Sequence, residues 1–101
     1  MPPLLSKEEI NSRLLQIQDW IQEGRFIQRS FSFATFMEAM AFVNQVAKLS
    51  EEMDHHPDIT INYDRVTFSL TTHSIGGLTR RDFRLAGQID NLPHSCDESI
   101  L

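Results

Sequence analysis

Three of the four histidines stand where proton-transfer chemistry could be organised. His55 and His56 are adjacent and are followed by Pro57, and His73 comes later, directly after Thr72. Histidine is the side chain best suited to take up and release protons near neutral pH. If the fold brings these three side chains together in one cleft, the residue types indicate general acid and base catalysis.

The His55-His56 pair is only a weak signal when it is taken alone, because surface loops commonly carry histidines. Pro57 fixes its own φ and favours an extended conformation at His56. Adjacent residues in irregular backbone point in different directions. The pair could therefore flank a ligand, or divide into one catalytic and one structural histidine.

A metal site is the alternative that uses the same part of the chain. Five residues offer ligand types that zinc or iron accepts: Glu51, His55, His56, His73 and Asp82. Adjacent histidines rarely face one ion, and the sequence has no His-x-x-x-His or Cys-x-x-Cys spacing. We therefore expect neither a metal nor a cofactor.

Composition excludes several other classes of function. The 101 residues carry a net charge of -5, which disfavours nucleic-acid binding, and the three arginines between positions 80 and 84 are too few to reverse this. The single cysteine, Cys96, supports neither a disulfide nor a catalytic nucleophile. No glycine-rich phosphate loop, signal peptide or membrane-spanning run is present. We expect a soluble cytoplasmic protein.

One domain, residues 1–101, fits this length, with a loose leader at 1–5 and a loose tail at 94–101. Three helices are predicted, and each opens with a capping box: Ser6 with Glu9, Thr35 with Glu38, and Thr79 with Asp82. The second helix reaches about Glu52, and Pro93 stops the third. Asp82 can therefore be explained as a helix cap alone, just as Glu51 can be a solvated residue of a last helical turn.

Four strands are predicted between these helices. Residues 20–23 and 26–33 form a hairpin around Gly24, and residues 59–63 and 66–70 form another with Asp64-Arg65 as its turn. By strand parity, His73 ends the second of these strands on its polar face, which it shares with Thr67, Ser69 and Thr71. The order α-β-β-α-β-β-α predicts an α+β domain, in which a four-stranded antiparallel sheet has three helices packed on one face. The other face is left for a ligand or another subunit.

The second helix carries apolar residues on more than one stripe: Phe36, Met37, Met40, Phe42, Val43, Val46 and Leu49. A helix that is apolar on two sides is usually buried on two sides. In so small a domain the second side could be a subunit interface or a partner surface. The alternative is a core helix with a wide apolar face.

Taken together, the segments around the histidines resemble the pterin-4a-carbinolamine dehydratases. The resemblance is carried by the run from Glu51 to Pro57 (EEMDHHP), Tyr63, Thr72-His73, the run from Gly77 to Thr79, and Asp82. It extends to residues 20–24 and 31–47, so that only the first few residues and the tail fall outside it. The combined pattern is specific, although no single piece is. One departure is Glu52, where the family often has lysine, and this concerns surface charge more than catalysis.

The resemblance implies a four-stranded antiparallel sheet with three helices, assembled as a homodimer or homotetramer through the sheet or the long helix. It also implies a lyase that removes water from 4a-hydroxytetrahydropterin to give quinonoid dihydropterin, in tetrahydrobiopterin recycling. This chemistry uses no metal and no redox cofactor. Proton transfers at ring N5 and at the 4a-hydroxyl are sufficient.

By the same resemblance, His55 and His56 form the acid/base pair, and His73 binds the ring and assists proton transfer. Asp82 caps the last helix and could also orient a histidine. The remaining residues expected to line the pterin pocket are Asp54, Pro57, Thr71, Thr72 and Ser74. Which histidine is the acid and which the base stays open.

A non-catalytic role is the second hypothesis. Some members of the resembled family stabilise dimers of a homeodomain transcription factor through the long helix, here residues 36–50. Relatives that lack the histidines serve as assembly factors. All three histidines are retained in this sequence, which favours the enzyme.

Overall fold

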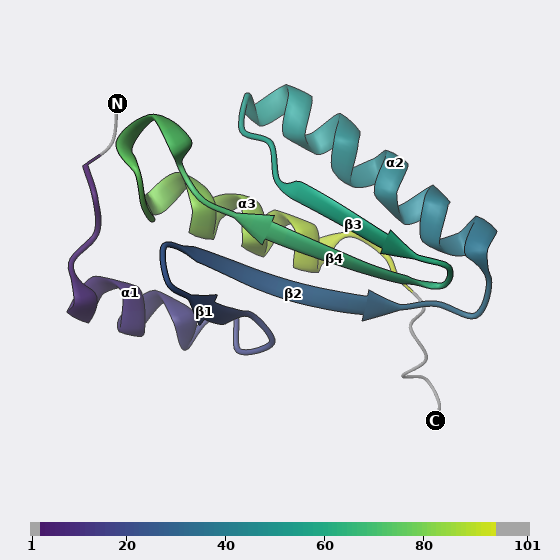
Figure 1. The fold of residues 1–101 in the computed structure, drawn as a ribbon, viewed down its shortest axis with the longest axis horizontal. Coiled ribbons are helices and arrows are strands. Elements are labelled where there is room, and N and C mark those ends of the chain that lie inside the picture. The colour runs from purple at the N-terminus through teal and green to yellow at the C-terminus, as the bar shows by residue number, and fades with distance from the viewer. Residues whose placement is uncertain (1–2, 95–101) are drawn as a thin grey trace.

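Residues 3–94, the part of the chain that the computed structural model describes, contain three α-helices, four strands and one turn of 3₁₀-helix (Figure 1). In chain order these are α1 (Lys7–Leu14), β1 (Ile21–Glu23), β2 (Phe26–Ser32), α2 (Phe36–Met53), β3 (Asp58–Asn62), β4 (Arg65–Leu70), η1 (His73–Ile75) and α3 (Arg80–Asn91). The predicted order α-β-β-α-β-β-α and the α+β class are confirmed.

The four strands form one antiparallel sheet in the order β1-β2-β4-β3. Both predicted hairpins are present, and β2 pairs with β4 at the centre of the sheet. Because β3 and β4 run in opposite directions, the start of β3 lies beside the end of β4, with Asp58 opposite Ser69. The segment with His55 and His56 and the segment with Thr72 and His73 therefore leave the sheet at the same end (Figure 1).

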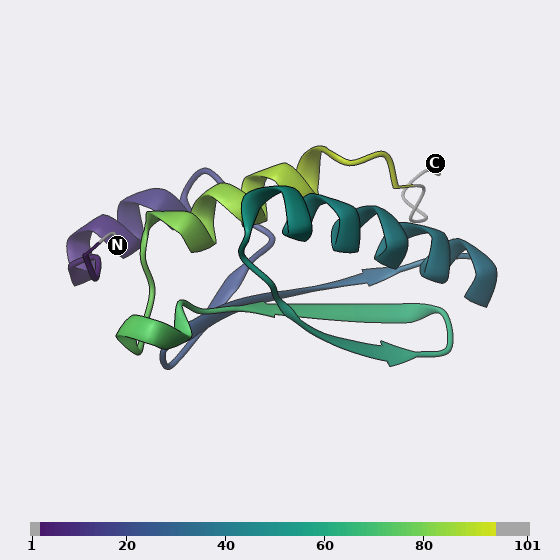
Figure 2. The same ribbon diagram turned by 90° about the horizontal axis from the view of Figure 1, so that it is seen from above.

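All three helices cover the same face of the sheet (Figure 2). Alternate residues of β2 and β4 point into this layer, where Phe31 and Phe68 are almost completely buried. Phe42 of α2 packs between them, with ring centroids 4.9 Å from Phe31 and 5.9 Å from Phe68. Burial of this apolar layer is the main force that holds the helices on the sheet.

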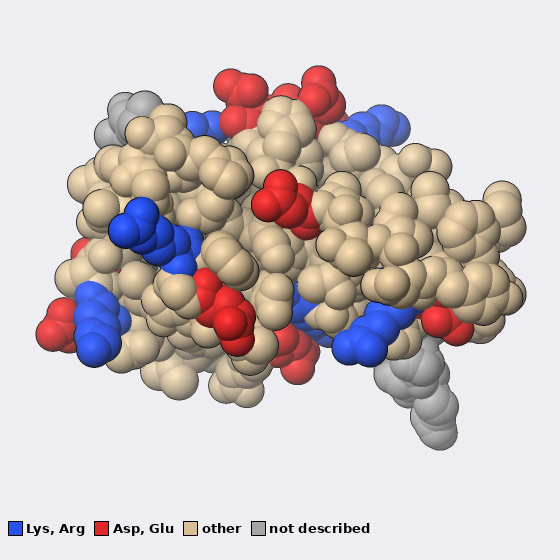
Figure 3. Space-filling view, in the orientation of Figure 1, with Lys and Arg blue, Asp and Glu red and all other residues tan. Residues whose placement is uncertain are grey.

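The opposite face of the sheet is polar, and no helix of residues 3–94 covers it (Figure 2). The hydroxyls of Ser30 and Thr67 lie 2.7 Å apart across neighbouring strands, and Ser69 donates to Gln28 at 3.2 Å. Seen from this side, most of the surface is uncharged, and the acidic and basic side chains are scattered (Figure 3). The predicted polar alternation of β2 and β4 is confirmed.

Two details at the ends of β4 differ from the prediction. The hairpin turn is Tyr63-Asp64, because Asn62 pairs with Arg65, and Tyr63 takes a left-handed φ of 55° as such short turns require. The expectation that His73 ends a strand is wrong. β4 stops at Leu70 and His73 begins η1, so strand parity does not place its side chain.

The apolar residues of α2 differ in how far they are exposed. Phe42, Val43 and Val46 are buried, whereas the large apolar residues left exposed are confined to the first turn, Phe36 and Met37. Phe36 stacks on Tyr63 with ring centroids 6.2 Å apart. Further along the helix, Met40 and Leu49 are partly buried.

The helix caps follow the predicted residues. Complete capping boxes form at Ser6 and at Thr79, whereas Thr35 shows the half in which its hydroxyl accepts from the backbone N–H of Glu38. Leu5 donates to the carbonyl of Leu78 at 3.0 Å. His94 packs edge-on against Phe31, with ring centroids 5.1 Å apart. The rest of the predicted tail, with Cys96, lies outside the described residues.

Replacing Thr35 with alanine is expected to lower the free energy of unfolding by about 1 kcal/mol, because one N–H of the first turn of α2 loses its acceptor. For a domain of this size the melting temperature should fall by about 4–8 °C. Thr35→Ser keeps the hydroxyl and serves as the control in thermal unfolding followed by circular dichroism. Equal melting temperatures for the alanine and serine variants would contradict the assignment of this cap.

None of the helices in residues 3–94 combines the length and the apolar character needed to cross a membrane.

Candidate active site

The turn that ends α2 determines where His55 and His56 lie. Asp54 caps the helix in the left-handed conformation, with φ 52° and ψ 45°. The N–H of His55 donates back to the carbonyl of Ser50 at 3.1 Å, which completes a turn of the kind in which glycine usually occupies the left-handed position. The chain thus reverses sharply, and only residues 54–57 separate α2 from β3.

His55 points inward, to a buried carboxylate. Its Nε2 lies 2.6 Å from Oδ1 of Asp82, the third residue of α3. His55 is 8% exposed and Asp82 is completely buried. A carboxylate accepts hydrogen bonds and does not donate them, so Nε2 of His55 carries the proton of this bond. That assignment leaves Nδ1 of His55 as the nitrogen that can exchange a proton with a ligand.

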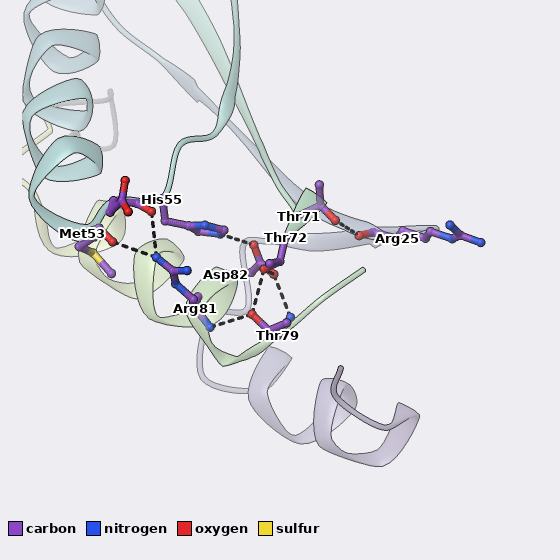
Figure 4. Close-up of polar contacts among 9 residues, drawn as sticks. Arg25, Met53, His55, Thr71, Thr72, Thr79, Arg81 and Asp82 are labelled. Atoms are coloured by element: carbon purple, nitrogen blue, oxygen red, sulfur yellow. Dashed lines mark hydrogen bonds and ion pairs between the residues drawn. The ribbon is translucent and has the colours of Figure 1, made fainter. Parts of the chain in front are cut away.

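Asp82 connects three segments of the chain (Figure 4). Besides His55, it accepts at Oδ2 from the hydroxyl of Thr72 and from the backbone N–H of Thr79, both at 2.9 Å. The hydroxyls of Thr72 and Thr79 also lie 2.9 Å apart. The predicted helix cap is therefore present, and the same carboxylate ties the end of α2 and the end of β4 to the start of α3.

His56 makes the corresponding contact on the surface. Its Nε2 lies 2.6 Å from Oε2 of Glu51, and both side chains are more than half exposed to solvent. Glu51 is thus a partner of His56 rather than only a solvated residue of the last helical turn. Because the carboxylate of Glu51 accepts this hydrogen bond, Nε2 of His56 carries the proton and Nδ1 takes no part in the bond.

His73 lies in a short loop that is tied to the same network. Thr72 and Gly77 form an isolated bridge, with the N–H of Thr72 donating to the carbonyl of Gly77 at 2.9 Å. Gly76 closes η1 with a left-handed φ of 76°, which glycine adopts without steric cost. The side chain of His73 is exposed, one residue after the buried Thr72 that donates to Asp82. All three histidines therefore adjoin the Asp82 network or the turn beside it.

The other residues expected to line a pocket differ in how accessible they are. Asp54 and Ser74 are exposed, while Pro57 and Thr71 are partly buried. The hydroxyl of Thr71 donates to the carbonyl of Arg25 at 2.6 Å. The side chains of Thr72 and Asp82 are buried and engaged in internal hydrogen bonds. A ligand beside the histidines would meet the exposed residues first. Thr72 and Asp82 could then act only indirectly, by holding the residues that the ligand contacts.

The five candidate metal ligands are arranged differently from a metal centre. His55 pairs with Asp82 and His56 pairs with Glu51. Within residues 3–94 no three His, Cys, Asp or Glu side chains gather in a way that could hold a metal ion. A groove of about 1260 Å³ does lie between α1 and α3, but none of the three histidines lines it.

Arg81 is the residue near the histidines that sequence reasoning missed. Its Nη2 donates to the carbonyl of Asp54 at 2.8 Å and to the carbonyl of Met53 at 3.2 Å (Figure 4). In the sequence it is one of three arginines in a charged run and has no distinguishing pattern. Only the packing of α3 beside the end of α2 reveals its contacts.

Comparison with known proteins gives a consistent result. Residues 3–92 match the family model described as pterin 4 alpha carbinolamine dehydratase. A protein of Picosynechococcus sp., provisionally named a pterin-4-alpha-carbinolamine dehydratase, is 48% identical over 92 residues, which cover 91% of this chain and 100% of that protein. A protein of Chloroflexus aurantiacus with the same provisional name is 51% identical over 90 residues, covering 89% and 97% of the two chains.

Solved structures extend the likeness. A crystal structure described as a transcriptional coactivator/pterin dehydratase from Brucella melitensis has a TM-score of 0.83 and 34% identity, and the match covers 87% of this chain and 96% of that one. A pterin dehydratase-like protein, described as a RuBisCO assembly factor in the alpha-carboxysome, has a TM-score of 0.58. Its match covers 70% of this chain and 82% of that one, and at 24% identity it supports the fold alone.

Proposed function

The chain belongs to the pterin-4a-carbinolamine dehydratase family, and from this membership we infer that it is a hydro-lyase that removes water from a 4a-hydroxytetrahydropterin. The product is the quinonoid dihydropterin. We further propose that His55 and His56 transfer the protons and that His73 holds the ring.

The observation that supports this mechanism best is the shared arrangement of His55 and His56. Each presents Nε2 to a carboxylate at 2.6 Å, which leaves Nδ1 as the nitrogen available to a substrate. A carboxylate behind a histidine fixes the tautomer and the direction of the ring. Such a histidine is suited to general acid or general base catalysis.

The dehydration needs one group of each kind. As the bond between C4a and the hydroxyl breaks, a protonated histidine supplies a proton and water leaves. A neutral histidine takes the proton from N5, and the electron pair of that N–H bond forms the double bond between N5 and C4a. The two histidines exchange their protonation states in one turnover, and proton exchange with solvent restores them. No oxidant or reductant is consumed.

The direct test is the disappearance of a 4a-hydroxytetrahydropterin, followed by stopped-flow absorbance with and without the protein. We expect the protein to accelerate dehydration well beyond the uncatalysed reaction in the same buffer. A rate equal to that of the buffer alone, from protein shown to be folded by circular dichroism, would remove the proposed activity.

His73→Ala is expected to raise the KM for the pterin about tenfold, because the loss of one hydrogen bond to a ligand costs about 1.4 kcal/mol. The value of kcat should fall less than in variants of His55 or His56. His73→Asn, which keeps a hydrogen-bonding group near the position of Nδ1, is the matched control and should show an intermediate KM. An unchanged KM in the alanine variant would exclude a ring-binding role.

Assembly and a protein-binding role stay predictions. On α2, the part that a partner or second copy could contact through apolar residues is the first turn, with the exposed Phe36 and Met37. The expected homodimer or homotetramer, and the possible partner surface at residues 36–50, are consistent with this exposure.

A further inference from the structure

We propose that Arg81 is a positioning residue for the catalytic histidines, acting through the backbone of the turn that carries them. The proposal rests on the proposed dehydratase function and deepens it. Nothing in the family likeness assigns this residue a role, and it is drawn from the contacts of its guanidinium group with Met53 and Asp54.

Arg81 binds two backbone carbonyls at the C-terminal end of α2. Those at the end of a helix have no partner within the helix, so they need a donor from elsewhere. Nη2 of Arg81 supplies one to Asp54 at 2.8 Å and to Met53 at 3.2 Å, with a positive charge at the negative end of the helix dipole of α2. No basic residue of α2 itself lies in its last turn. Arg81 therefore provides from α3 the C-terminal cation that α2 lacks.

The turn that Arg81 contacts has an unusual backbone conformation. Asp54 is a non-glycine residue in the left-handed region, with φ 52°, a conformation that is uncommon for side chains other than glycine and persists when the surroundings enforce it. The carbonyl that Arg81 binds at 2.8 Å belongs to the peptide that joins Asp54 to His55. Holding that oxygen fixes the plane of the peptide, and hence the direction in which His55 leaves the turn.

Two neighbouring residues of α3 hold His55 at two points. Arg81 binds the backbone immediately before it, and Asp82 binds its ring (Figure 4). The ring contact does not fix the carbonyl that precedes His55, and the backbone contact does not fix the ring. His56 follows directly and, within residues 3–94, makes no hydrogen bond to α3, so its placement depends on the turn that Arg81 fixes. Both histidines thus depend on the first turn of α3.

Arg84 offers a matched control. Both Arg81 and Arg84 line the groove between α1 and α3, but in residues 3–94 Arg84 makes neither a hydrogen bond nor an ion pair. Substituting either arginine removes one positive charge from the same helix. Only Arg81→Met removes the bonds to the turn, while keeping an apolar stem of similar length.

The experiment compares Arg81→Met and Arg84→Met in the steady-state dehydration assay. A displacement of reacting groups by about 1 Å can cost about 10²-fold in rate, so we expect kcat of Arg81→Met to fall about ten- to a hundredfold with a nearly unchanged KM. Arg84→Met should stay within about twofold of wild type. Arg81→Lys, which keeps the charge but not the planar fork, should lie between them.

A rescue separates positioning from general support of the fold. Glycine adopts the left-handed conformation without cost, so Asp54→Gly should make the turn less dependent on Arg81. The loss of kcat on adding Arg81→Met should then be at least several-fold smaller in the Asp54→Gly background than in wild type. Because the comparison is with Asp54→Gly alone, any direct role of Asp54 at the pterin cancels.

Three results would overturn the proposal: a kcat of Arg81→Met within twofold of wild type, equal losses in Arg81→Met and Arg84→Met, or an undiminished loss in the Asp54→Gly background. The positions of the His55 and His56 ring resonances in NMR spectra give a readout independent of turnover. They should shift in Arg81→Met and stay in place in Arg84→Met. If wild type lacks dehydratase activity while these resonances behave as expected, the proposed function fails and the positioning role stands.

Discussion

Replacing His55 with glutamine is expected to lower kcat for dehydration by about 10²–10⁴-fold while leaving the fold intact. Glutamine places an amide nitrogen near the position of Nε2, so it can still donate to the buried Asp82, which accepts from His55 at 2.6 Å. It has no nitrogen that titrates near neutral pH, so proton transfer is lost. Rapid-mixing kinetics with a 4a-hydroxytetrahydropterin measures the effect.

His56→Gln is the companion variant, because it preserves the contact with Glu51 in the same way. It is expected to show a loss in the same range, since the reaction needs both an acid and a base. Melting temperatures close to wild type for both variants would show that the loss is chemical. More than a tenth of the wild-type kcat in His55→Gln would exclude His55 from the proton transfers.

Asp82→Asn is expected to separate activity from stability. The introduced amide can keep an oxygen towards the N–H of Thr79, so the helix cap survives and the free energy of unfolding falls by only about 1–2 kcal/mol. Its NH₂ group then faces Nε2 of His55, which must become an acceptor. The proton of the ring moves to Nδ1, the nitrogen that we propose exchanges a proton with the substrate. A reversed tautomer of this kind can cost about 10⁴-fold in kcat.

Asp82→Ala removes the acceptor altogether. Three donors, from His55, Thr72 and Thr79, lose their partner inside the protein, and we expect a loss of about 3–5 kcal/mol of unfolding free energy. Urea unfolding of the alanine and asparagine variants beside wild type measures both effects. We expect the alanine variant to be clearly less stable than the asparagine variant. Similar free energies of unfolding for the two variants, or high activity in Asp82→Asn, would contradict the role proposed for this carboxylate.

Much of the fold follows from local patterns in the sequence. The capping residues Ser6, Thr35 and Thr79 each stand at the start of an observed helix. Alternation predicted the inward side of β2 and β4, because a strand with one buried face repeats every two residues. The predicted hairpin of residues 59–63 and 66–70 is present, and in the structure it brings the segments of His55 and His73 to the same end of the sheet. These inferences succeeded because each depends on residues close together in the chain.

The parts that could not be predicted depend on tertiary contacts. Tyr63 is bulky and unusual in a left-handed turn position, so nothing in its residue type marked it as the turn. The end of β4 and the start of η1 are set by the bridge from Thr72 to Gly77 and by the bond of Thr72 to Asp82. The alternation of residues along a strand predicts neither of these contacts.

For the site, the histidines could be named from the sequence, but their partners could not. The second role considered for Asp82, orienting a histidine, agrees with its bond to His55. The pairing of Glu51 with His56 and the contacts of Arg81 came only from the structure. Surface charges of this kind have the same residue types whether they hold a turn or merely face solvent. Their geometry distinguishes the two cases.

The central pairing of β2 with β4 has a consequence for the kinetics of folding. It joins residues 27–32 to residues 65–70, and so closes a loop that contains the whole of α2 and β3. Closing a long loop costs entropy before the contacts compensate for it, so this pairing is expected to form later than the two hairpins. The contacts of His55, His56 and Asp82, by contrast, all lie between residues 51 and 82. The hydrogen bonds of the candidate site can therefore begin to form before the sheet is complete.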